Sequence, residues 1–135
     1  MADDLKLVKE LRDKTGAGFL DCKEALSNNN GNIDNAIDYL RKKGLAKASK
    51  KSSREANEGA IGFYENNSTC ILIKINSETD FAAKSDTFLN FVDYIGKTIL
   101  DLNKTQLDLD TFLDTKISSK SIKEIVDEMI AKIGE

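Results

Sequence analysis

The apolar residues of this chain change from helical to alternating spacing near Gly59, and this change limits the fold more than any other feature. In residues 1–44 they recur every three or four positions, which is the period of an amphipathic helix. Beyond Gly59 they alternate with polar residues, which is the period of a half-buried strand. Separate segments with these two periods predict an α+β fold, in which a helical module precedes a core that contains a sheet.

Residues 1–44 are expected to form three short helices. The first ends near Thr15, the second follows Gly18, and the third is capped by Asn32 and stops at Gly44. A helix triplet of this size buries little area and is only marginally stable. We therefore interpret it as a docking module and not as a container for chemistry.

Residues 45–58 lose the apolar period and are expected to form a basic linker, partly helical because Ala and Lys favour helix. No acidic residue interrupts the basic run between Arg41 and Arg54. Such a run can contact nucleic acid. This run, however, contains no aromatic residue for base stacking, and the whole chain carries a formal charge of -3. A solvated linker is the favoured interpretation, and RNA binding is kept as an alternative.

Residues 59–135 are expected to form an α+β core. Its alternating segments predict a β-hairpin with one apolar face, which a neighbouring element has to cover. A following helix with apolar residues at helical spacing can provide that cover. The expected elements are strands at 60–64 and 69–76, a helix capped by Ser85 that carries Phe88 to Ile99, a helical turn at 111–113, and a last helix with Ser121 and Glu124 at capping-box spacing.

The apolar stripe of the last helix reaches Ile133, close to the end of this sequence. Chain ends are usually polar and frayed. Two interpretations stay open: either this helix packs on the hairpin, or the natural chain continues beyond residue 135 and this sequence is a fragment.

The composition argues against an enzyme. The chain contains no His, so it has no Ser-His or Cys-His pair and lacks the commonest transition-metal ligand. Its two cysteines, Cys22 and Cys70, are too few for a zinc site and are expected on buried faces as small apolar residues. Neither a signal peptide nor a membrane span is found, and we expect a cytoplasmic protein that binds no membrane.

Between the second strand and the following helix, Phe81 is a large ring among small and charged residues. One hypothesis is a local staple, in which Asp80 caps a turn and the Phe81 ring lies under the sheet. The other is that the ring projects into a pocket on a partner, as aromatic residues do at the centres of interfaces. Composition alone does not separate the two.

Two motifs in the right order resemble signatures of one family. The string Val8-Lys9-Glu10-Leu11-Arg12, with Thr15 to Gly18 and Asp21 to Leu26, is similar to the opening of the translation elongation factor Ts family. The string Glu78-Thr79-Asp80-Phe81-Ala82 resembles its second signature, and residues 131–135 resemble a stretch in the middle of longer members. The resemblance covers essentially the whole chain, and two motifs about 55 residues apart are more specific than either alone.

The resemblance implies that residues 1–44 form a docking domain of the ubiquitin-associated type and that residues 59–135 form the first half of the family core. It implies a guanine-nucleotide exchange factor for elongation factor Tu, a GTPase, with no cofactor, metal or small-molecule substrate of its own. Ala82 stands where the family usually has Val, and Phe19-Leu20 where two Met residues are frequent. The implied contact residues are Arg12, Phe19, Leu20 and Lys23 for docking, and Thr79, Asp80, Phe81 and Ala82 for insertion near the magnesium of the partner.

An exchange factor of this kind needs a wedge and an anchor instead of an active site. GDP is held through phosphate contacts and a magnesium ion with strict octahedral geometry, so a small displacement of the ligands weakens nucleotide binding. Phe81 suits the wedge and the helical module suits the anchor. The alternative function is a protein interaction module of the ubiquitin-associated type without exchange activity, which would use residues 1–44 and leave the hairpin without a role.

Overall fold

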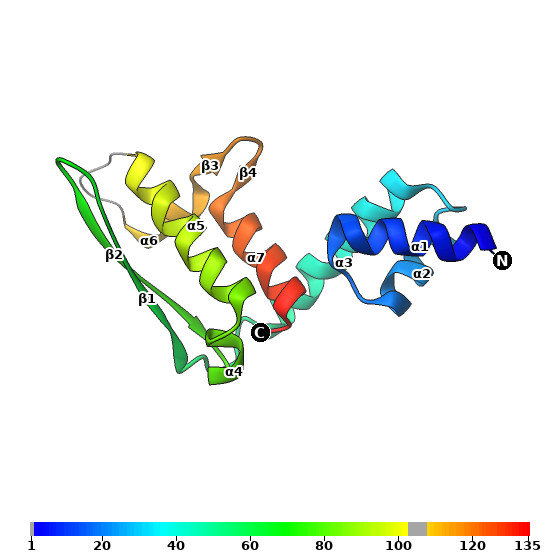
Figure 1. Ribbon diagram of the computed structural model, residues 1–135, viewed down its shortest axis with the longest axis horizontal. Helices are drawn as coiled ribbons and strands as arrows, with labels where there is room; N and C mark the ends of the chain where they lie inside the picture. Colours follow the sequence, from blue (N-terminus) through cyan, green and yellow to red (C-terminus); the bar gives the residue numbers. More distant parts are fainter. Residues whose placement is uncertain (1, 103–107) are drawn as a thin grey trace.

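The computed structural model describes residues 2–102 and 108–135. Over these residues the chain is a mixed helical and β structure, which confirms the expected α+β class. The elements are α1 (Ala2–Thr15), α2 (Phe19–Asn28), α3 (Ile33–Lys51), β1 (Glu58–Glu65), β2 (Cys70–Ser77), α4 (Asp80–Ala83), α5 (Asp86–Leu102), α6 (Leu109–Asp114), β3 (Lys116–Ile117), β4 (Lys120–Ser121) and α7 (Ile122–Ile133). Figure 1 shows α1 to α3 at one end of an elongated molecule, the β1–β2 hairpin at the other, and α3 meeting α7 between them.

The three expected N-terminal helices are present and enclose a small core of their own. Asn32 caps α3, because its Oδ1 accepts a hydrogen bond from the backbone N–H of Asn35 at 2.9 Å. The six buried residues of this core come from all three helices: Val8, Leu11, Cys22, Ala25, Leu26 and Ala36. The helical spacing seen in the sequence therefore selects the inward faces correctly.

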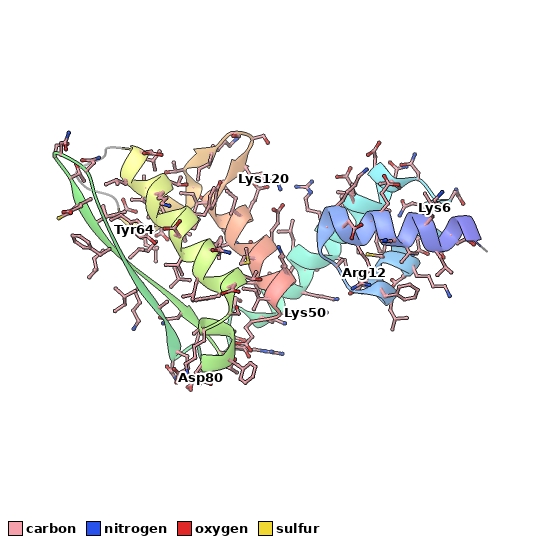
Figure 2. All side chains as sticks on the ribbon, in the orientation of Figure 1. Lys6, Arg12, Lys50, Tyr64, Asp80 and Lys120 are labelled. Atoms are coloured by element: carbon pink, nitrogen blue, oxygen red, sulfur yellow. The ribbon has the colours of Figure 1, made fainter. Side chains whose placement is uncertain are left out.

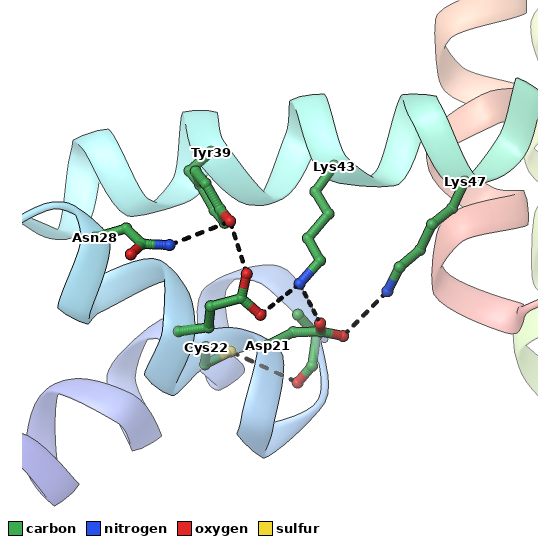
Figure 3. Close-up of polar contacts among 8 residues, drawn as sticks. Asp21, Cys22, Asn28, Tyr39, Lys43 and Lys47 are labelled. Carbon is green, nitrogen blue, oxygen red and sulfur yellow. Dashed lines mark hydrogen bonds and ion pairs between the residues drawn. The ribbon is translucent and has the colours of Figure 1, made fainter.

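A polar network ties α2 to α3 on the outside of this core (Figure 3). The ammonium group of Lys43 donates to Glu24 at 2.7 Å and lies 2.9 Å from Asp21, and the hydroxyl of Tyr39 donates to Glu24 at 2.7 Å. Lys47 adds a longer contact of 3.4 Å to Asp21. The hydrogen bonds from Lys43 hold the pKa values of both carboxyl groups below their usual range and raise the pKa of Lys43 itself.

The predicted helix stop at Gly44 is wrong, because α3 continues to Lys51 through the first half of the expected linker. Gly44 instead lies where α3 packs against α7. A Cβ atom at this position would lie 2.9 Å from the Cβ of Ala131 in α7, so the missing side chain allows the two helices to approach closely. The glycine that suggested a helix end thus lies at a contact between two helices that are far apart in the sequence. The division into domains at residues 44 and 58 stays a prediction.

The core is built on the predicted hairpin. β1 and β2 are antiparallel over their full lengths, with Phe63 opposite Leu72. The inward face of β2 carries Ile73 and Ile75, which pack against α5 through Phe88 and its neighbours. The expected cap of α5 is also present, since the Oγ of Ser85 accepts a hydrogen bond from the backbone N–H of Phe88 at 3.2 Å.

The C-terminal part contains one element that the sequence did not predict. The expected helical turn is present as α6, and the capping box of Ser121 and Glu124 opens α7. Between them lies the short β3–β4 hairpin, which turns at Ser118 with a φ of 59°. α7 packs mainly along α3 and also contacts α5, which lies between α7 and the hairpin (Figure 1). Residues 103–107 of the expected polar stretch lie outside the described residues.

Only one of the two cysteines lies where it was expected. Cys22 is buried in the helical module, where burial raises the pKa of its thiol. Cys70 is exposed, because it opens β2 on the face that points away from α5. Within residues 2–102 and 108–135, no helix has the length and apolar character needed to cross a membrane, and no three His, Cys, Asp or Glu side chains are grouped to hold a metal ion.

The contact at Gly44 predicts a sensitive position between the two halves. Gly44→Val should lower the free energy of unfolding by about 1–3 kcal/mol, because the added side chain forces α7 away from α3. Ala46→Val is the matched control on the exposed side of the same helix and should cost only about 0.5 kcal/mol in helix propensity. Urea denaturation followed by circular dichroism measures both, and equal losses would contradict the packing role of Gly44.

The network of Figure 3 predicts a pH dependence of stability. The pKa of Asp21 is lower in the folded protein than its ordinary value of 3.8, so the contribution of this carboxylate is present above that pH and is lost as the pH falls through the folded pKa. Asp21→Asn should cost at most about 1 kcal/mol near pH 7, and the difference from the parent should shrink as the pH falls below 3.8 through the lower folded pKa of Asp21. Asp38→Asn, on the exposed side of α3, is the control and should not reproduce this pH profile.

Candidate functional site

The segment that follows β2 forms a tightly capped turn. The buried Ser77 at the end of the strand donates a hydrogen bond from its Oγ to the carbonyl oxygen of Thr79 at 2.9 Å. Thr79 is the N-cap of α4, because its Oγ1 accepts from the backbone N–H of Ala82 at 3.2 Å. These two bonds change the chain direction from strand to helix within a few residues.

The Phe81 ring points away from the protein at the tip of this turn. Its exposed fraction is 88%, the highest among the exposed large apolar residues in the described part of the chain. Ala82 and Ala83 point inward instead, and Ala83 packs in the cluster that includes Phe88 and Val92. The staple hypothesis is therefore wrong: Thr79 and not Asp80 caps the turn, and the ring does not lie under the sheet.

Asp80 is paired with the next turn of its own chain. Its carboxylate accepts a hydrogen bond from the ammonium group of Lys84 at 2.9 Å, and this bond lowers the pKa of Asp80 and raises that of Lys84. Both side chains are largely exposed. The exposed surface of the turn therefore combines one aromatic ring with a solvated ion pair, as labelled at Asp80 in Figure 2.

Glu135 makes a contact with this turn that the sequence did not predict. The carboxylate of Glu135 accepts from the backbone N–H of Thr79 at 2.8 Å and from its Oγ1 at 2.7 Å. Beside it, Arg54 lies 3.4 Å from Glu78. No local pattern could have indicated the Glu135 contact, because Thr79 and Glu135 are 56 residues apart.

The four predicted docking residues lie on α1 and α2. Arg12 and Phe19 line the same hollow, whose volume is about 380 Å³ and whose other walls are Leu5, Val8, Lys9, Asp13, Gly16 and Ala17. Gly16 has a φ of +69°, which bends the chain sharply between the two helices. Leu20 is 78% exposed and Lys23, one helical turn further, is exposed as well. The module thus presents an apolar surface with basic residues at its border.

The two surfaces lie in different parts of the fold and are connected through α3. In Figure 2, Arg12 is on the lower side of the helical module and Asp80 is at the lower end of the core, with Lys50 at the junction between them. They do not form one pocket. A single partner that contacts both has to span the junction of α3 and α7.

Four of the seven basic side chains in the run that suggested RNA binding make contacts within the protein. Lys43 and Lys47 bond to carboxylates of α2, Lys51 donates to the carbonyl oxygen of Gly134, and Arg54 contacts Glu78. Through these contacts, the basic side chains link α3 and the segment after it to α2 and to the core.

Residues 78–135 of the chain match the family model described as Elongation factor TS. The match begins at Glu78, the first residue of the second signature, and extends through α7. The helical module lies outside the matched range, so its assignment to the ubiquitin-associated type and the contact roles of Arg12, Phe19, Leu20 and Lys23 stay predictions.

The exposure of Phe81 predicts that its ring contributes little to folding. Phe81→Ala should change the free energy of unfolding by less than about 0.5 kcal/mol. Phe88→Ala is the comparison, because its ring is 4% exposed and its loss should cost about 3–5 kcal/mol. Chemical denaturation of the two variants measures the difference, and a large loss for Phe81→Ala would mean that the ring packs inside the protein in solution.

Proposed function

Because this chain belongs to the elongation factor Ts family over residues 78–135, we propose that it is a guanine-nucleotide exchange factor for elongation factor Tu. The observation that carries this proposal is the presentation of Phe81, a large apolar ring that is 88% exposed on a turn fixed by hydrogen bonds. The geometry suits a wedge better than a catalytic site. An exchange factor for a translational GTPase shares the compartment of its partner, so the proposal includes a cytoplasmic location.

The wedge acts through differential binding. Burial of the Phe81 ring in a partner is worth roughly 1.5–3 kcal/mol. Because the turn is already capped by Thr79, little further ordering is needed when the ring inserts, and more of this free energy remains available. A magnesium ion tolerates little change in its coordination, so insertion beside it weakens the binding of GDP. Asp80 lies next to the ring, where its carboxylate can exchange the contact with Lys84 for one with the partner.

The helical module provides the anchor. Leu20 and Phe19 offer exposed apolar surface at the start of α2, and Arg12 and Lys23 add positive charge beside it. Contacts of this kind are made equally before and after GDP leaves, so they set the concentration at which the protein docks and not the rate of release. The wedge and the anchor therefore have separable effects.

Thermodynamic linkage makes the effects of this protein and of GDP on the partner reciprocal. If this protein lowers the affinity of its partner for GDP by some factor, GDP lowers the affinity of the partner for this protein by the same factor. No bond is formed or broken, and no side chain has to transfer a proton. Rebinding of nucleotide then releases the protein for another cycle.

The separation of wedge and anchor can be measured by stopped-flow release of a fluorescent GDP from purified elongation factor Tu. Phe81→Ala should lower the maximal release rate by about tenfold or more and change the half-saturating concentration by less than about threefold. Leu20→Ala should do the converse. Phe63→Ala removes another exposed ring, 60% exposed on the outer face of the hairpin, and should leave both quantities unchanged.

Equal maximal rates for Phe81→Ala and the parent would contradict the wedge. Absence of any acceleration by the parent protein would contradict exchange activity altogether. In that case, binding of the full chain to ubiquitin in a pull-down would favour the alternative, an interaction module of the ubiquitin-associated type.

A further inference from the structure

We propose that Glu135 is a positioning residue: its carboxylate holds Thr79, and through Thr79 the Phe81 turn, in a fixed orientation relative to the docking module. This inference deepens the proposed function and rests on it. It concerns a residue that lies two positions beyond the end of α7, outside both surfaces predicted from the sequence.

The first step is the double contact with Thr79. The Glu135 carboxylate accepts both the backbone N–H and the hydroxyl proton of Thr79, at 2.8 Å and 2.7 Å. Once the hydroxyl proton points to Glu135, a lone pair of the same oxygen is left to accept from the backbone N–H of Ala82 at 3.2 Å. Hydrogen bonds to an ionised acceptor are stronger than neutral ones. Glu135 therefore selects the hydroxyl orientation that caps α4, the helix of Phe81.

The second step is the connection of Glu135 to the docking module. Gly134 ends α7 in the left-handed conformation, with a φ of 90°, and turns the chain so that Glu135 faces Thr79. Lys51, the last residue of α3, donates a hydrogen bond to the carbonyl oxygen of Gly134. α3 also carries part of the core of the docking module. One hydrogen-bonded path thus joins the helix of the anchor to the turn of the wedge.

The consequence concerns rate more than affinity. Without the Glu135 contact, the module still docks through its own residues, but the turn has to be ordered during insertion of the ring. The free energy needed to order the turn then adds to the barrier of the step in which GDP is displaced. A purely structural role of Glu135 would instead lower stability and affect docking and release together.

Three variants test this in the GDP-release assay. Glu135→Ala should lower the maximal release rate by about 3- to 10-fold, with less than a twofold change in the half-saturating concentration. Glu135→Gln keeps an oxygen acceptor and should restore part of the rate. Asp127→Ala is the matched control, because it removes the ion pair with Lys123 within α7 without touching Thr79, and it should equal the parent.

A second readout in the free protein does not depend on exchange activity. Amide hydrogen exchange at Thr79 should be about tenfold faster in Glu135→Ala than in the parent and unchanged in Asp127→Ala. Unchanged exchange at Thr79 in Glu135→Ala would overturn the positioning role even if the protein proves to be an exchange factor. Faster exchange at Thr79 together with an inactive parent protein would contradict the proposed function and leave the contact intact. Faster amide exchange with an unaltered maximal rate would overturn the link between the contact and the wedge.

Discussion

The close packing of α3 on α7 determines how the rest of this protein is arranged. α3 begins in the core of the helical module and ends at Lys51 beside the C-terminal end of α7, so one helix belongs to both halves. The approach is possible because Gly44 faces Ala131, where a side chain on α3 would collide. Since a helix is stiff over this length, the packing fixes the distance between the surface of the helical module and the Phe81 turn.

The exposure of Phe81 results from several contacts that act together on neighbouring residues. The side chains of Ser77 and Ala82 are buried, and Asp80 forms an ion pair with Lys84. The hydroxyl of Thr79 donates a hydrogen bond to Glu135 and accepts one from the backbone N–H of Ala82. With its neighbours fixed in this way, the ring has no inward position left within a helix of four residues. An apolar ring in water is unfavourable for the free protein, and a partner that covers it gains the corresponding free energy.

Much of the fold could be predicted because its signals are local. The alternation in β2 and the helical spacing in α5 follow from burial of one face, and the caps at Asn32, Ser85 and Ser121 follow from their own backbone bonds. The errors have another origin. The end of α3 and the exposure of Cys70 depend on which segment packs against which. The strands of the β3–β4 hairpin are too short to show an alternating pattern of apolar and polar residues.

The sequence by itself determined the α+β class, the order of the helices and strands other than α4 and the β3–β4 hairpin, and the motif that presents Phe81, because each depends on residues close together in the chain. Only the tertiary structure decided that the ring points outward, that α3 continues past Gly44, and that Glu135 holds Thr79. These features depend on contacts between distant segments, such as the 56 residues that separate Thr79 from Glu135. Periodicity and capping rules describe local preferences, and the choice among distant partners is made when the apolar faces are buried together.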